Sequence, residues 1–309
     1  MSVRAAVIGV GHLGKHHARI LAALPGVELV GIVDTNQERA AAIAAEHGTR
    51  VVASGADLLG RVDAVSIAVP TESHLEVALP FLRAGVGVLV EKPMARSLDE
   101  ADAMIAAAAE GGATLAVGHT ERFNPAVAVA RALLSDPRFI EVHRLGTFPE
   151  RSLDIDVVFD LMIHDIDVVL SLVRSEVESI EAAGTPVLTP RIDIANARIR
   201  FANGCIANLT ASRISRDRVR KIRFFQPAGY LSIDYAAQKV EGYRPVKGSG
   251  PLPTIQGGEL PVVNEEPLKR ELADFVEAVA TRRAPQVDGA QGRRALHLAT
   301  RIVERMATS

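Results

Sequence analysis

A glycine-rich turn between an apolar strand-like run and a helix-like run constrains the fold of this 309-residue chain more than any other feature. Residues 3–8 are small or apolar apart from one arginine, and the chain then reads Gly9-Val10-Gly11-His12-Leu13-Gly14. A second apolar run, 27–33, is followed by Asp34, twenty residues after the last glycine of the turn. The G-x-G-x-x-G pattern alone is a weak signal. With a strand before it, a helix after it and an acid at this distance, it predicts a dinucleotide-binding βαβ unit.

Each residue type in this motif suits a bound dinucleotide. Gly9 permits a sharp turn, Gly11 lets a pyrophosphate approach the backbone, and Gly14 allows helix and strand to pack closely. The helix N-terminus would stabilise the phosphates through its free N–H groups and its dipole. Asp34 can accept hydrogen bonds from a ribose and would repel a 2′-phosphate, and the two residues after it are threonine and asparagine rather than arginine. The motif therefore predicts NAD as the cofactor in preference to NADP.

Composition excludes several other classes of protein. Hydrophobic residues make up 48% of the chain, which predicts a folded globular protein, and the length suggests two domains. The net charge of −2 offers no positive field for nucleic acid, and the few aromatic residues include no Trp for base stacking. The single cysteine, Cys205, excludes an intrachain disulfide, and its apolar neighbours indicate a buried side chain.

Neither a targeting segment nor a membrane segment is expected. The first strand would begin at Val3, which leaves no room for a signal peptide. No apolar run approaches the ~20 residues that span a bilayer. We therefore expect a cytoplasmic protein with no membrane partner and no nucleic-acid partner.

Strand-like and helix-like segments divide the chain into two parts. Up to about residue 120, uniformly apolar segments alternate with helical ones, which predicts a parallel sheet covered on both faces. From 177 to 243 the segments alternate in polarity, which predicts an antiparallel sheet with one open face. The predicted fold is α/β: an N-terminal Rossmann doubly wound parallel sheet plus a C-terminal α+β domain with a large open antiparallel sheet. The predicted domains are 1–120 for the dinucleotide, 121–285 for substrate and oligomerisation, and 286–309 as a helix that returns to the Rossmann domain.

Local signals refine the second part. Asn203-Gly204 lies between two strand-like runs and predicts a tight hairpin. The segment 244–265 contains six prolines or glycines between Gly248 and Gly258, which is typical of a surface loop. In a monomer, the apolar residues on the open face of this sheet would be exposed to solvent. We therefore expect this face to be covered by another copy of the chain, in a homodimer or homotetramer.

Two positions carry side chains suited to proton transfer. Lys92 follows a buried strand in Glu91-Lys92-Pro93, at the carboxyl end where ligands bind in open α/β sheets. That position suits either a salt-bridged edge residue or a catalytic group beside a nicotinamide. Asp160, His164 and Asp167 are spaced i, i+4 and i+7, which places them on one helix face. A carboxylate one turn before a histidine raises the proton affinity of its ring, as a general base requires, although a buried structural pair has the same spacing.

The sequence offers little support for a metal site and one candidate for an anion site. A catalytic zinc site usually needs three firm protein ligands, and no second histidine forms an H-x-x-x-H pair with His164, so we expect no metal. A basic cluster that contains one acid, Asp217, lies further along the chain: Arg213, Arg216, Arg218, Arg220, Lys221 and Arg223. Arginine forks match phosphate geometry, so this cluster would suit a substrate with a diphosphate. A solvated hairpin explains the same residues.

Taken together, these motifs resemble the glucose–fructose oxidoreductase/inositol dehydrogenase/MocA (Gfo/Idh/MocA) family of NAD(P)-dependent oxidoreductases. The resemblance covers essentially the full length. Besides the glycine motif and Asp34 it rests on Ala68-Val69-Pro70-Thr71, Glu91-Lys92-Pro93, Gly118-His119-Thr120-Glu121-Arg122-Phe123-Asn124-Pro125 and the Asp160/His164/Asp167 helix. In this family the lysine of E-K-P and the Asp and His of a D-x-x-x-H helix form the catalytic group, which implies catalytic roles for Lys92, Asp160 and His164.

The resemblance also implies which residues bind the ligands. The implied cofactor contacts are Gly9, Gly11, His12, Leu13, Gly14, Asp34, Pro70, Thr71, His74, Glu91 and Lys92. The implied substrate contacts are His119, Arg122, Asn124, Asp167 and Arg213.

Within the family, one stretch is similar to bacterial enzymes that oxidise UDP-N-acetylglucosamine at C3: Leu153-Asp154-Ile155-Asp156 and His164-Asp165-Ile166-Asp167, with Ala211-Ser212-Arg213 downstream. The implied reaction is NAD-dependent oxidation of a secondary sugar hydroxyl to a ketone, on a nucleotide sugar. His164 would accept the hydroxyl proton, Asp160 would hold its ring, and Lys92 would donate to the alkoxide or itself act as the base. The alternatives are an inositol or free-aldose dehydrogenase and a non-catalytic NAD-binding regulator.

Overall fold

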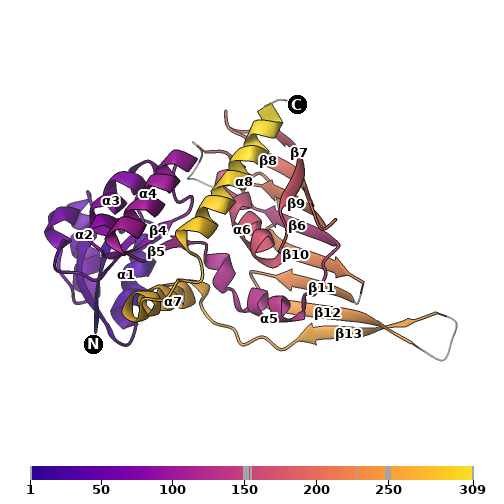
Figure 1. The fold of residues 1–309 in the computed structure, drawn as a ribbon, viewed down its shortest axis with the longest axis horizontal. Coiled ribbons are helices and arrows are strands. Elements are labelled where there is room, and N and C mark those ends of the chain that lie inside the picture. The colour runs from indigo at the N-terminus through magenta and orange to yellow at the C-terminus, as the bar shows by residue number, and fades with distance from the viewer. Residues whose placement is uncertain (1, 149–152, 154, 228, 248–251, 308–309) are drawn as a thin grey trace. The chain divides into compact units, whose positions relative to one another are not determined.

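The computed structural model describes residues 2–148, 153, 155–227, 229–247 and 252–307, which form two compact units (Figure 1). Unit 1 comprises Met1–Thr120 and Leu268–Leu296, and unit 2 comprises Glu121–Pro267 and His297–Ser309. The sequence pattern assigns 268–285 to the second domain, whereas the structure places that segment in unit 1. The physical reason is that Leu272 and Phe275 are buried in the apolar core cluster of unit 1.

Unit 1 is built on a five-stranded, fully parallel sheet in the order β2-β1-β3-β4-β5. Its strands are β1 (Val3–Ile8), β2 (Val27–Val33), β3 (Ala64–Ile67), β4 (Gly87–Glu91) and β5 (Leu115–Gly118). The helices of unit 1 are α1 (Gly14–Ala23), α2 (Gln37–Glu46), α3 (His74–Arg83), α4 (Leu98–Gly111) and α7 (Pro267–Thr281), with short helical turns η1 (Gly55–Leu58) and η2 (Thr71–Ser73). Two elements run from unit 1 into unit 2: the short turn η3 (Thr120–Phe123) and the last helix, α8 (Gly289–Ala307), whose residues from His297 onward belong to unit 2 and not to the Rossmann domain as predicted. Strands β3, β4 and β5 are buried along their whole length. This confirms the prediction that the uniformly apolar runs of the sequence form parallel strands. The predicted Rossmann domain is confirmed.

Helix ends in unit 1 follow the local sequence signals. The Ser97 side chain accepts a hydrogen bond from the Glu100 N–H at the start of α4. The helix ends at Gly112, whose φ of +64° is the left-handed conformation that glycine adopts without strain.

Unit 2 is built on an eight-stranded sheet in the order β13-β12-β11-β10-β6-β9-β8-β7. Its strands are β6 (Phe139–Leu145), β7 (Val177–Thr185), β8 (Ile194–Phe201), β9 (Ile206–Ser212), β10 (Val219–Gln226), β11 (Gly229–Asp234), β12 (Lys239–Val246) and β13 (Thr254–Leu260). All neighbours pair antiparallel except β6 and β9, which are parallel. Unit 2 also contains helices α5 (Pro125–Leu133) and α6 (Ile163–Leu172) and the π-helical turn η4 (Val158–Met162). Helix α5 packs on β11 and β12 (Figure 1), and η4 packs on β9.

The other face of the unit 2 sheet carries a ladder of aromatic rings across four neighbouring strands. Phe139 packs on Phe225 with ring centroids 5.6 Å apart, and Phe225 packs on Tyr230 at 5.0 Å. Tyr230 stacks on Tyr243 at 5.9 Å. These rings alternate with buried residues such as Ile140 on the helix-covered face, as an amphipathic strand requires.

Of the two local predictions for unit 2, one is confirmed and one is wrong. The hairpin at Asn203-Gly204 joins β8 and β9, and Gly204 has a φ of +85°. The predicted loop 244–265 instead contains the end of β12 and all of β13, which pair with each other. Gly257 allows the two strands to approach closely, because a side chain there would collide with the Gly242 carbonyl. Residues 248–251 of the predicted loop lie outside the described residues.

Among the residues that the structure describes, no helix combines the length and apolar character needed to cross a bilayer.

Candidate active site

Residues expected to bind the cofactor follow the carboxyl ends of adjacent parallel strands in unit 1. Ile8 of β1 pairs with Val33 of β2 and with Ile67 of β3, so Gly9, Asp34 and residue 68 leave the sheet side by side. The carboxyl edge of an open parallel sheet is where such folds bind ligands.

The glycine loop has the geometry that its sequence predicts. Gly9 has a φ of +84°, and a side chain there would lie 2.8 Å from the Ala68 carbonyl oxygen. A side chain at Gly14 would collide with the Gly9 carbonyl where α1 begins, whereas one at Gly11 would meet only open space. The loop therefore packs tightly at its two ends and leaves room for a phosphate group at its centre and at the N-terminus of α1. NAD fits this arrangement.

Asp34 is 7% exposed and already carries three hydrogen bonds. Its Oδ2 accepts from the Val10 N–H at 2.7 Å, and its Oδ1 accepts from the Asn36 N–H at 2.8 Å. Its third donor is Arg39, whose Nη2 lies 2.7 Å from Oδ1. Burial alone would raise the pKa of Asp34, but Arg39 and the two backbone donors outweigh it and hold the pKa below its usual value. The expectation that no arginine lies beside Asp34 is wrong, because the first turn of α2 brings Arg39 back to the carboxylate.

The other expected cofactor contacts differ in accessibility. His12 and Leu13 are exposed in the glycine loop, as is Pro70 after β3, while Thr71 is half-buried. His74 is 1% exposed and lies between two carbonyls, with Nδ1 3.0 Å from Pro93 O and Nε2 3.0 Å from Val69 O. Burial lowers its pKa. His74 thus ties the segment after β3 to the segment after β4 rather than presenting its ring to solvent.

Glu91 and Lys92 leave β4 in different environments. Glu91 is buried, and its Oε1 lies 3.1 Å from Nε2 of the fully buried His17, whose Nδ1 is 2.6 Å from Ser66 Oγ. Burial would raise the pKa of Glu91, but His17 outweighs it and lowers the pKa. Lys92 is half-buried, its N–H donates to Glu91 Oε2 at 3.2 Å, and a cis peptide bond joins it to Pro93. Glu91 is thus an interior anion that fixes the backbone of Lys92.

In unit 2, Asp160 lies in η4 and His164 in the first turn of α6, and both are half-buried. The carbonyl of Asp156 accepts the backbone N–H groups of Phe159 and Asp160, at 3.0 and 3.1 Å, and so starts this helix. Asp167, in contrast, is 2% exposed, and its Oδ2 accepts from Arg122 Nε at 2.9 Å.

Most of the expected substrate contacts are buried in polar networks. Arg122 is 6% exposed beside Asp167, and Asn124 is 2% exposed. Asn124 caps α5 through the Ala126 N–H and donates to the Tyr235 carbonyl at 3.0 Å. His119, after β5 in unit 1, is 1% exposed. These positions organise the protein interior, and direct substrate contact by them stays a prediction.

A second buried cluster of charged side chains in unit 2, centred on Arg144, was not predicted from the sequence. Arg144 donates to both carboxylate oxygens of Asp165, at 2.6 and 3.0 Å, and to Glu121 Oε1 at 3.0 Å. Its guanidinium lies 5.2 Å from the centre of the Tyr235 ring. The available signal was the alternation of β6, which places Arg144 on the same face as two buried aliphatic residues, Ile140 and Val142.

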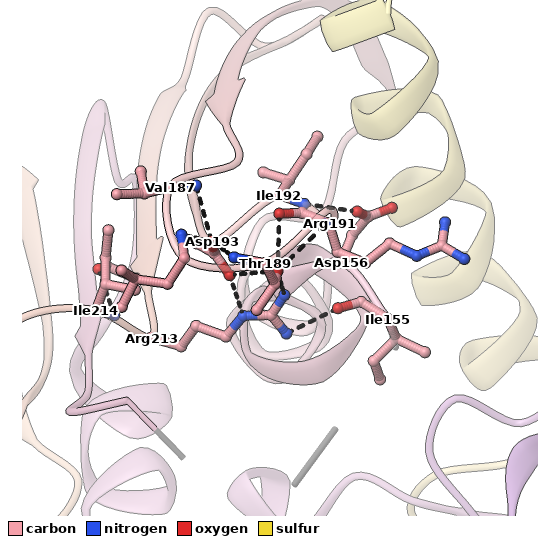
Figure 2. A network of polar contacts seen from close by, with 11 residues as sticks. Ile155, Asp156, Val187, Thr189, Arg191, Ile192, Asp193, Arg213 and Ile214 are labelled. Atoms are coloured by element: carbon pink, nitrogen blue, oxygen red, sulfur yellow. Dashed lines mark hydrogen bonds and ion pairs between the residues drawn. The ribbon is translucent and has the colours of Figure 1, made fainter. Parts of the chain in front are cut away.

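Arg213 is the centre of the network in Figure 2 and is 1% exposed. Its Nε donates to Asp193 Oδ1 at 2.7 Å, and its Nη1 donates to the Ile155 carbonyl at 2.8 Å. Asp193 is 0% exposed and also accepts the backbone N–H groups of residues 187, 188 and 189. Burial would raise the pKa of Asp193, but these N–H donors and Arg213 outweigh it and hold the pKa far below its usual value.

The same network reaches the start of the helix that carries Asp160. Ile155 is followed by Asp156, whose Oδ1 accepts from the Ile192 N–H at 3.0 Å. Arg213 and the 187–193 loop therefore hold the chain immediately before η4 (Figure 2). Asp154, in the same stretch, lies outside the described residues.

The basic cluster does not act as one patch. Arg213 is buried with Asp193, while on β10 Arg223 pairs with Glu141 at 3.0 Å and Lys221 lies 3.6 Å from Asp234. Arg220, which is exposed, lies opposite Arg144 in the pairing of β10 with β6. The two exposed arginines of the turn between β9 and β10 are Arg216 and Arg218. The described residues contain no group of three or more His, Cys, Asp or Glu side chains placed to hold a metal ion.

Comparisons with known proteins agree with this geometry. Residues 3–119 match the model of an oxidoreductase family with an NAD-binding Rossmann fold, and residues 127–231 match that of the GFO/IDH/MocA C-terminal domain. The UDP-N-acetylglucosamine 3-dehydrogenase of Acidithiobacillus ferrooxidans is 41% identical over 304 residues, which cover 97% of this chain and 96% of that protein. The NAD⁺-dependent scyllo-inositol 2-dehydrogenase of Bacillus subtilis is 30% identical over 69% of this chain and 68% of its own.

Solved structures give the same picture. A crystal form of the Acidithiobacillus ferrooxidans enzyme superposes with a TM-score of 0.94 at 40% identity and covers 100% of this chain and 98% of its own. A levoglucosan dehydrogenase in complex with NADH and L-sorbose has a TM-score of 0.90 at 20% identity, over 100% of this chain and 98% of that one, and shows that the fold is shared.

Proposed function

The chain belongs to the GFO/IDH/MocA family of NAD-dependent oxidoreductases, and we propose that it oxidises the C3 hydroxyl of UDP-N-acetylglucosamine to a ketone. The observation that carries this proposal is the extent of the match to the Acidithiobacillus ferrooxidans enzyme, at 41% identity over 97% of the chain. The match to the inositol dehydrogenase of Bacillus subtilis is weaker, at 30% identity over 69% of the chain. A nucleotide sugar is therefore favoured over an inositol.

The chemistry divides between a proton acceptor and a charge-stabilising group. When bound, NAD supplies the acceptor for the hydride that leaves the carbinol carbon. His164 accepts the hydroxyl proton, and Asp160, four residues before it, orients the imidazole and stabilises its protonated form. Lys92 donates a hydrogen bond to the alkoxide as negative charge develops. The family resemblance supports these roles, and the half-buried state of all three residues is compatible with contact to substrate.

Arg216 and Arg218 are our candidates for the diphosphate of the nucleotide sugar. They follow Arg213, whose guanidinium holds the carbonyl just before η4, so the turn begins near the start of the helix that carries Asp160. They are exposed, whereas Lys221 and Arg223 face acidic partners on the sheet. This assigns the anion-binding role to the turn rather than to the whole basic cluster.

The direct test is NADH formation by the purified protein with a panel of UDP-sugars, free sugars and inositols. Turnover on UDP-N-acetylglucosamine with little or none on N-acetylglucosamine supports the proposal. Turnover on a free sugar or an inositol keeps the reaction class but refutes the substrate. Tight NADH binding without turnover on any compound would favour the non-catalytic regulator.

Ionic strength and a double variant test the anion site. Because charge pairing is screened by salt, the KM for UDP-N-acetylglucosamine should rise with ionic strength while kcat stays nearly constant. In the Arg216→Ala/Arg218→Ala protein the KM should be higher and its salt dependence weaker. The matched control is Lys221→Ala/Arg223→Ala on β10, which should leave the KM within about twofold because both residues already face carboxylates.

Assembly and location complete the proposed function. The aromatic ladder on the uncovered sheet face supports a homodimer or homotetramer formed through that face. Light scattering of wild type and of Tyr230→Asp tests this, since a charge within the ladder should shift the mass toward the monomer. The enzyme is proposed to work in the cytoplasm, which cell fractionation would check.

A further inference from the structure

The Asp34–Arg39 pair lies where the adenosine ribose of a dinucleotide is recognised. Asp34 follows β2, the position from which an acidic residue meets the ribose 2′-hydroxyl in Rossmann folds. Arg39 belongs to the first turn of α2, and its side chain is 44% exposed while that of Asp34 is 4% exposed. An exposed cation thus covers a buried anion at the cofactor edge of the sheet.

The hydrogen bonds of Asp34 leave little capacity for a ribose while Arg39 is in place. A carboxylate offers about four acceptor sites. Among the described residues, the Val10 N–H takes one site on Oδ2, and the Asn36 N–H and Arg39 take those on Oδ1. Only about one site remains, on Oδ2. A ribose with two free hydroxyls would bind Asp34 fully only when Arg39 turns away.

Charge is the second consequence of the pair. An unpaired carboxylate at this position repels a 2′-phosphate, which is the usual reason for selectivity against NADP. Arg39 Nη2 lies only 2.7 Å from Asp34 Oδ1, so its positive charge nearly cancels the repulsion that the carboxylate would exert on a 2′-phosphate. A guanidinium also presents a fork of donors that matches phosphate oxygens.

We propose that Arg39 is a mobile specificity residue: it leaves the carboxylate for a 2′-phosphate, so that the enzyme binds NADP as well as its usual cofactor NAD. The inference rests on the NAD-binding fold of the family and not on which sugar is oxidised. A purely structural role explains the pair less well, because an exposed arginine in such a pair contributes little to stability.

The same sheet supplies a matched control. Arg4, at the start of β1, donates from Nη2 to Asp63 Oδ1 at 2.8 Å, and its side chain is also 44% exposed. This pair lies at the amino end of β1, whereas Asp34 follows the carboxyl end of β2. The Arg4→Ala change therefore removes a similar arginine–aspartate pair away from the cofactor edge.

The experiment measures the Kd of NADH and of NADPH by calorimetry for wild type, Arg39→Ala, Arg39→Lys and Arg4→Ala, without any sugar. We expect measurable NADPH binding by wild type. In Arg39→Ala the ratio of Kd for NADPH to Kd for NADH should rise about tenfold or more, as loss of one charge-assisted contact predicts. The Kd for NADH should stay within about threefold or fall, because Oδ1 of Asp34 is released. Arg39→Lys should give an intermediate ratio, and Arg4→Ala the wild-type ratio.

Two results would overturn the proposal: no NADPH binding by wild type, or a ratio in Arg39→Ala within about twofold of wild type. The second result includes an equal loss of NADH and NADPH binding, which would mean that Arg39 only supports the fold of the site. The readout needs no substrate, so failure of the proposed sugar specificity would leave these measurements unaffected.

Discussion

Replacing Arg213 with methionine tests whether the network in Figure 2 supports unit 2 or binds an anion. The change removes hydrogen bonds to Asp193 Oδ1 at 2.7 Å, to the Ile155 carbonyl at 2.8 Å and to Thr189 Oγ1 at 3.1 Å. It keeps an unbranched apolar side chain in the same space. Asp193, which is 0% exposed, is left without its cation.

The expected loss of stability follows from that burial. Removing one partner of a buried ion pair costs about 3–5 kcal/mol. Asp193 keeps three backbone N–H donors and the Thr189 hydroxyl, so the lower end, about 3 kcal/mol, applies here. In a domain of roughly 150–250 residues each kcal/mol moves Tm by about 2–4 °C, which gives a fall of about 6–12 °C.

The loss should depend on pH in a defined direction. The pKa of Asp193 is lower in the folded protein than in the unfolded chain, so its ionised form stabilises the fold above the unfolded pKa of about 4. That contribution is lost as the pH falls through the folded pKa. Because removal of Arg213 weakens this contribution, the difference in stability between wild type and variant should be full at neutral pH and should shrink only as the pH falls below about 4, toward the folded pKa of Asp193.

Thermal unfolding at several pH values, with Arg223→Met as control, measures this effect. The Arg223–Glu141 pair is 39% and 30% exposed, so its loss should cost no more than about 1 kcal/mol. In kinetics, Arg213→Met should lower kcat more than it raises KM, since the network holds the chain before Asp160. An unchanged Tm together with a KM raised tenfold or more would refute the structural role and restore Arg213 as a substrate contact.

Three further predictions concern the cofactor loop, the catalytic base and the thiol. Gly14→Ala should abolish NADH binding in calorimetry, because the new Cβ collides with the Gly9 carbonyl; binding like that of wild type would mean that the loop is looser than described. His164→Ala should lower kcat about 10²–10⁴-fold and leave the Kd for NADH nearly unchanged, and near-normal turnover would point to Lys92 as the base. Burial raises the pKa of Cys205 to about 11, so it should react with a disulfide reagent at pH 8 only after denaturation, and rapid reaction of the native protein would contradict its burial.

The cofactor site was the most predictable part of the molecule, because its signals are local in sequence. The glycine spacing fixes which residues turn and which pack, and the structure reproduces this at Gly9 and Gly14. Arg39 was not predicted, because it lies five residues after Asp34 and only the two residues directly after the acid were expected to lie beside it. The turn of α2 that follows brings a residue five positions away back to the carboxylate.

The buried ion pairs of unit 2 were not predictable from local patterns. Arg213 and Asp193 lie twenty residues apart on different segments, and their contact depends on the pairing of β8 with β9. Arginines in a basic run look like a solvated surface or an anion site, and only the fold shows that one of them is interior. The loop predicted at 244–265 failed for a related reason, since Gly257 permits a close strand pairing that the sequence cannot distinguish from a turn.

The division of unit 1 into two chain segments has a consequence for protein synthesis. The ribosome releases residues 1–120 long before 268–296, yet the core around β1 includes Leu272, Phe275 and Val276 from α7. Until α7 emerges, apolar surface on the nascent nucleotide-binding unit stays uncovered and open to chaperones or to misassociation. Unit 2 lies mostly between the two segments but also includes residues 297–309, so neither unit has its whole chain until the C-terminal region has emerged. The N-terminal segment of the nucleotide-binding unit is therefore made first, yet it completes its core only with a segment made near the end of synthesis.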